Sequence, residues 1–146
     1  MQHQPKETAM KTDLHLVFSG KCREAFAFYE KTFNTKVQFT MTFGEAPEGV
    51  PVPPDGKDLI LHTSMPFGGI TLMGCDAPKG GEATLGGFQI SVSDPSSDEV
   101  ERLFDELKAS GSVQMPLGKT FWSPLFGMCT DKFGVAWMVS VPGPQM

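Results

Sequence analysis

The sequence predicts an α+β fold of two tandem βαβββ modules, in which a curved mixed sheet forms a cleft and the helices lie on its outer face. Three observations predict it. Runs of alternating apolar and polar residues indicate half-buried strands. Each half of the chain carries one amphipathic helical pattern after its first such run. Glycine and proline clusters separate these elements. The order strand, helix and three strands therefore occurs twice, as a repeat of pattern rather than of letters.

The first module begins with a strand and an amphipathic helix. Residues Asp13–Phe18 alternate between apolar and more polar side chains, which predicts a strand. In Cys22–Phe33 the apolar residues recur with helical spacing, and Asn34 is suited to end that helix in the left-handed conformation. Lys36–Phe43 alternates again and is predicted to be a second strand.

A proline-rich loop then interrupts the pattern. Gly44–Lys57 contains four prolines, which excludes a regular strand or helix there. Loops of this length often serve as lids or binding loops, or are simply mobile. Asp58–Met65 and Ile70–Cys75 are predicted to be the third and fourth strands, joined by a hairpin at Pro66–Gly69.

The second module repeats this order. Gly86–Val92 alternates and predicts a strand, and the next helix starts near a possible capping box of Ser96 and Glu99. Gly111 is predicted to end that helix. The turn before the last strand has Asp131, whose side chain is suited to accept hydrogen bonds from the turn backbone. The remaining strands are predicted at Val113–Pro116, Leu125–Thr130 and Val135–Val141.

These elements give a simple domain organisation. Residues 1–12 are predicted to be a disordered leader, and residues 13–146 a single domain. That domain consists of modules 13–76 and 86–141, joined by a linker at 77–85.

Composition excludes several classes of partner and site. The net charge is -5 and the 12 basic residues are scattered, which argues against nucleic acid and anionic membranes as partners. No apolar run reaches the length of a membrane span, and the N-terminus is too polar for a signal peptide. Cys22, Cys75 and Cys129 are far apart, so neither a disulfide framework nor a zinc site is predicted. We expect a cytoplasmic protein.

Short strings in both modules carry a family resemblance. The most specific are Thr120-Phe121-Trp122 through Phe126-Gly127, Thr130–Gly134 and Trp137-Met138; others are Phe18–Cys22, Ala27–Tyr29, Phe43–Glu45 and Ile60–His62. In these strings the chain resembles the vicinal oxygen chelate superfamily, which contains glyoxalase I, extradiol dioxygenases and bleomycin-resistance proteins. Within it, the chain is similar to the PhnB-like group. The resemblance runs from about Asp13 to Val141 and implies the same fold.

The resemblance also implies where a divalent metal would lie. Enzymes of this superfamily hold such an ion with His, Gln or Glu side chains from the first and last strands of each module. Most of the matching places hold residues that are poor ligands for a hard or borderline cation. His15 remains a candidate ligand, or else an ordinary strand residue, and we expect no metal cofactor. The matching places are Asp13–His15, Thr71–Met73, Gly87–Gln89 and Met138.

Members of the PhnB-like group are often labelled 3-demethylubiquinone-9 3-methyltransferases. A nucleotide-type methyl donor normally needs a glycine-rich turn between a strand and a helix. The glycine pairs of this chain lie at predicted hairpins and linkers, and none of them opens a helix. The sequence therefore does not support methyl transfer.

Three polar residues are candidates for ligand binding. His62 lies on the third strand and could act as a polar anchor or general base in the cleft, or else be an ordinary histidine at the sheet surface or a dimer seam. Gln89 could donate hydrogen bonds to a ligand or simply face outward. Asp76 could orient a ligand or cap the linker that follows it.

Aromatic residues supply the rest of the predicted site. Trp122, Phe121 and Phe126 lie together before the final hairpin and could line a pocket for a flat or apolar ligand. Core packing is the alternative for each of them.

Three functions are compatible with the sequence. The first is a metal-free small-molecule-binding protein with an aromatic cleft, forming a homodimer, as the resemblance implies. The second is an enzyme with one divalent metal, a lyase, isomerase or dioxygenase acting on a vicinal dioxygenated substrate. The third is a structural or partner-binding module without a small ligand. We rank the binding protein first.

Overall fold

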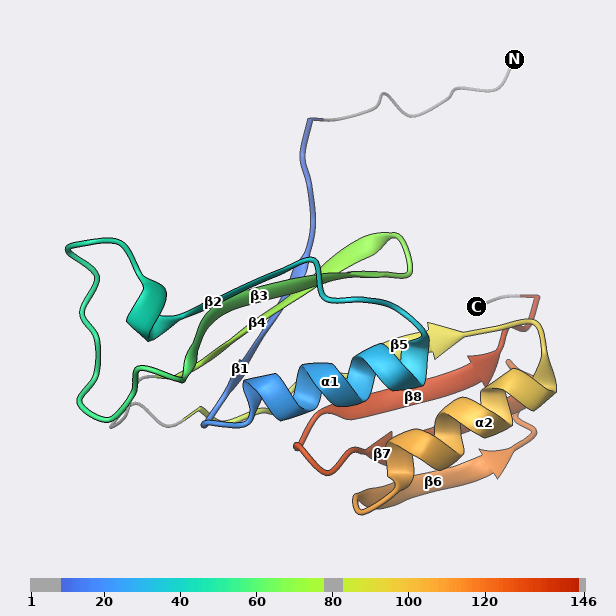
Figure 1. Ribbon diagram of the computed structural model, residues 1–146. Helices are drawn as coiled ribbons and strands as arrows, with labels where there is room; N and C mark the ends of the chain where they lie inside the picture. Colours follow the sequence, from blue (N-terminus) through green and yellow to red (C-terminus); the bar gives the residue numbers. More distant parts are fainter. Residues whose placement is uncertain (1–8, 78–82, 145–146) are drawn as a thin grey trace.

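The computed structural model describes residues 9–77 and 83–144, which form two four-stranded sheets and two α-helices (Figure 1). This confirms the predicted α+β fold with its two βαβββ modules. No described helix is long and apolar enough to cross a membrane. The elements are β1 (Leu14–Phe18), α1 (Cys22–Phe33), β2 (Phe39–Thr42), the 3₁₀ helix η1 (Phe43–Glu45), β3 (Ile60–Phe67), β4 (Ile70–Asp76), β5 (Ile90–Ser93), α2 (Ser97–Lys108), β6 (Ser112–Gly118), β7 (Leu125–Thr130) and β8 (Ala136–Val141). Residues 1–8 of the predicted leader and 78–82 of the predicted linker lie outside the described residues.

The two modules have the same strand connectivity. In the first sheet, which we call sheet A, the strand order is β1-β4-β3-β2, and in sheet B it is β5-β8-β7-β6. The first strand of each module runs parallel to the last, and the other pairs are antiparallel. The repeat inferred from pattern alone is therefore a repeat of topology.

Each sheet has one face covered by helices and one open face. In sheet A, Leu16 and Leu72 point into the core and are almost fully buried, whereas Val17 on the opposite face is 37% exposed. In sheet B, Val139 points into the same core, which α2 covers. The open faces lack such a cover among the described residues, so they are the surfaces on which the predicted cleft would lie.

The first helix ties the two modules together. Tyr29 of α1 reaches Asp131 in the turn before β8, and its hydroxyl donates to Oδ2 over 2.7 Å. Trp137 of β8 donates its Nε1–H to the same oxygen over 2.8 Å. The other oxygen accepts from the backbone N–H groups of Phe133 and Val135, as predicted for this turn. A side chain of the first module thus completes a buried network in the second.

Two strands are much shorter than predicted: β2 covers Phe39–Thr42 instead of Lys36–Phe43, and β5 covers Ile90–Ser93 instead of Gly86–Val92. β2 ends at Thr42 because the chain then turns into η1, where Thr42 and Glu45 cap each other. β5 begins at Ile90 instead of Gly86. The backbone at Gly87 has a φ of 77°, a conformation that does not continue a strand.

Helix ends follow the predicted chemistry with one exception. Asn34 ends α1 in the left-handed conformation, and Ser96 caps α2 by accepting from the N–H of Glu99. The predicted end of α2 at Gly111 is wrong, because Ser110 makes the left-handed turn with a φ of 60°. Gly111 is needed for another reason, since a Cβ there would lie 2.0 Å from a backbone oxygen of β7.

The proline-rich loop and the hairpin after it are compact. The N–H of Gly44 donates to the carbonyl of Lys57 over 2.9 Å, which closes the base of the loop. β3 continues through Pro66 and Phe67, so the hairpin turn is confined to Gly68 and Gly69, both with positive φ.

Candidate functional site

Two histidines meet on the open face of sheet A. His15 lies on β1 and His62 on β3, with β4 between these strands. Strands are spaced about 4.8 Å apart, so residues two strands away start roughly 10 Å apart. The ring centroids are nevertheless 5.9 Å apart, with the ring planes inclined by 19°. The imidazoles therefore lean toward each other across β4, and Phe39 of β2 adds a third ring 6.0 Å from His62.

This face presents uncharged polar groups beside apolar surface. Burial, and secondly the neighbouring His62, lower the pKa of His15, so its imidazole is uncharged at neutral pH. Burial and the nearby Asp76 carboxylate raise the pKa of the Cys75 thiol, which therefore stays protonated. Phe39 is 47% exposed. The arrangement can hold a flat molecule by ring contacts and by hydrogen bonds to the imidazoles.

The predicted aromatic residues form a second cluster, with Phe121 and Trp122 on the loop between β6 and β7 and Phe126 on β7. The ring of Trp122 lies 4.6 Å from that of Phe121 and 5.3 Å from that of Phe126. Ser123 fixes the loop by donating to the carbonyl of Val141 over 2.6 Å. Phe121 is 97% exposed, whereas Phe126 is buried. Phe126 therefore serves mainly as the base of the cluster, and Phe121 and Trp122 are its accessible part.

The two remaining predicted residues lie apart from both clusters. Asp76 is buried, and its two carboxylate oxygens accept from the backbone N–H groups of Cys22 and Ile60 over 3.0 and 2.9 Å. It fixes the start of α1 to β3, and a ligand contact by Asp76 stays a prediction. Gln89 is exposed and directly precedes β5, beside Phe88.

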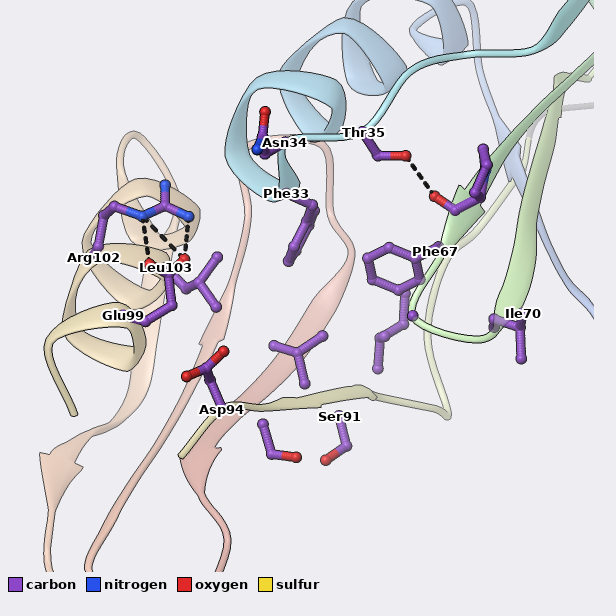
Figure 2. Close-up of a pocket in the computed structure, with 15 residues that line it drawn as sticks. Phe33, Asn34, Thr35, Phe67, Ile70, Ser91, Asp94, Glu99, Arg102 and Leu103 are labelled. Atoms are coloured by element: carbon purple, nitrogen blue, oxygen red, sulfur yellow. Dashed lines mark hydrogen bonds and ion pairs between the residues drawn. The ribbon is translucent and has the colours of Figure 1, made fainter. Parts of the chain in front are cut away.

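A cavity of about 750 Å³ lies where the two modules meet (Figure 2). Its walls are the end of α1, the β3–β4 hairpin, β5 and the first half of α2. Phe33 and Phe67 meet edge to face in it, with centroids 4.8 Å apart. Pockets for small ligands commonly measure about 300–1,000 Å³. None of the site residues predicted from the sequence is among the described residues that line this cavity.

The family model of the Glyoxalase/Bleomycin resistance protein/Dioxygenase superfamily matches residues 12–139. The chain belongs to this superfamily. The match includes residues of every strand in both sheets, and it confirms the resemblance that the sequence strings carry.

Relatives in the superfamily are similar over nearly their whole length. Protein YjdN of Escherichia coli (strain K12) is 34% identical over 139 residues, which are 90% of this chain and 95% of YjdN. The crystal structure of protein PA1353 from Pseudomonas aeruginosa is 41% identical, with a TM-score of 0.84, covering 92% of this chain and 98% of that one. A Bacillus cereus structure described as a putative 3-demethylubiquinone-9 3-methyltransferase, PhnB protein, is 25% identical, with a TM-score of 0.77, covering 90% and 99%.

Strand register locates the positions at which the superfamily resemblance would put a metal. His15, the second residue of β1, pairs with Met73 on β4. The equivalent second residue of β5 is Ser91, not one of the predicted residues Gly87–Gln89, because β5 begins only at Ile90; Ser91 pairs with Met138 on β8. One imidazole, one hydroxyl and two thioethers do not fit a hard or borderline divalent cation. Among the described residues, no three or more His, Cys, Asp or Glu side chains are placed to share an ion.

The structure thus separates the predicted site into parts. It brings His15 and His62 together and groups Trp122 with its two phenylalanines, but no ring contact joins these clusters within the described residues. Sequence reasoning missed Phe39, because the alternation in Lys36–Phe43 placed it with the apolar residues of the buried face, whereas it is 47% exposed. It also missed the cavity, whose Phe33 and Phe67 come from segments that meet only in the folded chain.

Proposed function

We propose that this superfamily member binds a flat small molecule on the open face of sheet A, without a metal ion. The observation that carries this proposal is the row of rings formed by His15, His62 and Phe39. A row of three rings on an uncovered sheet face offers stacking surface that the core does not use.

The chemistry of the ring row limits which class of ligand can bind there. The neutral imidazole of His15 has one nitrogen that donates and one that accepts a hydrogen bond, so it can satisfy one polar edge of a ligand. Phe39 and Val17 are partly exposed and provide apolar surface on either side. A planar aromatic molecule with a hydroxyl or carboxyl group matches this combination.

We further propose that the protein is a homodimer whose second copy covers the open faces of sheets A and B. Large apolar side chains are exposed on both halves of the chain, including Phe39 at 47% and Phe121 at 97%. Exposed apolar groups of this size commonly mark interaction surfaces. The rings of Trp122 and Phe121 would then complete the cleft from the partner's side. The free cysteines of the described residues are consistent with a reducing compartment such as the cytoplasm.

Native mass spectrometry tests the metal and the dimer together. The protein is incubated in turn with nickel, zinc, manganese and iron(II), and we expect a dimer without stoichiometric metal. One ion per site that is lost in His15→Ala or His62→Ala would overturn the proposal and favour a metal-dependent enzyme. Ligand binding is then followed by quenching of Trp122 fluorescence with flat aromatic acids, and His62→Ala should weaken it about tenfold through loss of one charge-assisted hydrogen bond.

A further inference from the structure

The cavity between the modules opens onto an unpaired strand edge. β5 is the outermost strand of sheet B and pairs only with β8 among the described strands. The N–H of Asp94 donates to the carbonyl of Ser140 on β8 over 3.1 Å. Successive residues of a strand direct their backbone groups to opposite sides. The N–H and C=O groups of Ser91 and Ser93 therefore point away from β8, toward the cavity that all of β5 lines.

Apolar side chains form the opposite wall. The rings of Phe33 and Phe67 lie across the cavity from β5, and Leu103 lines it from α2 (Figure 2). Both phenylalanines are packed against Trp137 on one side, at 5.1 and 6.1 Å, yet remain partly exposed on the other. They form a preformed apolar corner that lines the same cavity as the open backbone edge of β5.

One end of the cavity carries uncompensated negative charge. Arg102 is paired with Glu99 and with Glu106, and also donates to the carbonyl of Thr32 over 2.9 Å. Its positive charge is therefore already matched by two carboxylates. Asp94 adds a third carboxylate, whose Oδ1 accepts a hydrogen bond from the N–H of Ser96 over 2.8 Å.

We propose that this cavity is a docking site for an extended peptide segment of a partner protein, which adds a strand to the free edge of β5. Backbone groups on one side of a strand repeat every two residues, about 6.6–6.8 Å, a spacing that another extended backbone matches. The apolar corner takes an apolar side chain of the segment, and Asp94 attracts a basic residue two positions away on the same side. The site shares no residue with the proposed ring row on sheet A and does not rest on it.

A synthetic peptide tests the site directly. The probe is a fluorescein-labelled, C-terminally amidated pentapeptide of threonine, leucine, threonine, lysine and threonine, and its binding to the full-length protein is followed by fluorescence anisotropy. Two N-methylated versions of the peptide are compared with it, and each blocks one of the two alternating sets of amide N–H groups. If the segment pairs with β5, methylation of the set that faces Ser91 and Ser93 weakens binding about tenfold or more, since it removes two hydrogen bonds. Methylation of the other set has little effect. Equal affinity of both versions and the parent peptide would overturn strand pairing.

The charge is tested with matched variants of the protein. Asp94→Asn should weaken binding of the parent peptide about threefold, but not binding of a peptide with norleucine in place of lysine. Asp98→Asn makes the same charge change on α2 outside the cavity and should leave both affinities unchanged. Absence of peptide binding, or equal effects of the two variants, would refute the assignment. Both variants keep His15, His62 and Phe39, so the binding of aromatic acids to them separately reports whether the ring-row proposal holds.

Discussion

The buried contact between Tyr29 and Asp131 makes a quantitative prediction about how the two modules hold together. Tyr29→Phe removes one hydroxyl and keeps the ring, so packing against Trp137 is unchanged. A hydrogen bond from a neutral donor to a charged acceptor contributes about 1.5–3 kcal/mol. Because Oδ2 of Asp131 keeps its bond from Trp137 at 2.8 Å, we expect a loss near the lower end, about 1.5–2 kcal/mol. At roughly 4 °C per kcal/mol for a chain of this size, the Tm should fall by about 6–8 °C.

Urea unfolding followed by far-UV circular dichroism, together with calorimetry, measures this loss. Thr35→Val is the matched control, since it also removes a single hydroxyl, one that donates to the carbonyl of Pro66 over 2.8 Å at an exposed position. It should cost less than about 0.5 kcal/mol. If Tyr29→Phe costs no more than the control, the Asp131 network does not join the modules in the way argued above.

Three further predictions concern single positions. The pKa of His15 is lowered in the folded state, so its protonation there is disfavoured. The folded protein therefore binds fewer protons than the unfolded chain and loses stability as the pH falls below about 6.5. In urea unfolding, the free energy of unfolding should differ less between pH 7.5 and pH 5.5 in His15→Gln than in wild type. Gly74→Ala places a Cβ 2.5 Å from the ring of Phe26 and should cost about 1–3 kcal/mol in chemical unfolding, whereas Gly86→Ala meets open space and should be nearly neutral. Asp76→Asn leaves one buried backbone N–H without its acceptor and should cost about 1–3 kcal/mol by the same measurement; a neutral result would mean that the carboxylate is not needed at the start of α1.

Local signals in the sequence predicted most elements, because their causes are local. Asn34 and Ser96 end and start helices by interactions with neighbouring backbone. Errors arose where such signals conflict. Phe88 and Ile90 alternate with polar residues as in a strand. The positive φ of Gly87 nevertheless breaks the extended backbone, and β5 begins only at Ile90.

The candidate site was less predictable, because its geometry depends on how distant strands curl. Alternation placed His15 and His62 on the open face, but it gave no indication that their rings approach to 5.9 Å across an intervening strand. Asp76 looked available for a ligand, because the two N–H groups that occupy it come from α1 and β3. Only long-range packing distinguishes such a carboxylate from an accessible one.

The placement of α1 against β8 affects how the chain could be divided. A fragment that ends after β4 would keep the sequence of the first module. Tyr29 and Phe33 of its helix would lose the indole of Trp137, against which they pack. A fragment of the second module would expose the indole of Trp137, and Asp131 would lose the hydrogen bond that Tyr29 donates. The halves share a topology, yet we expect neither of them to fold alone. Amide hydrogen exchange in α1 and β8 should therefore report one common opening free energy instead of two independent ones.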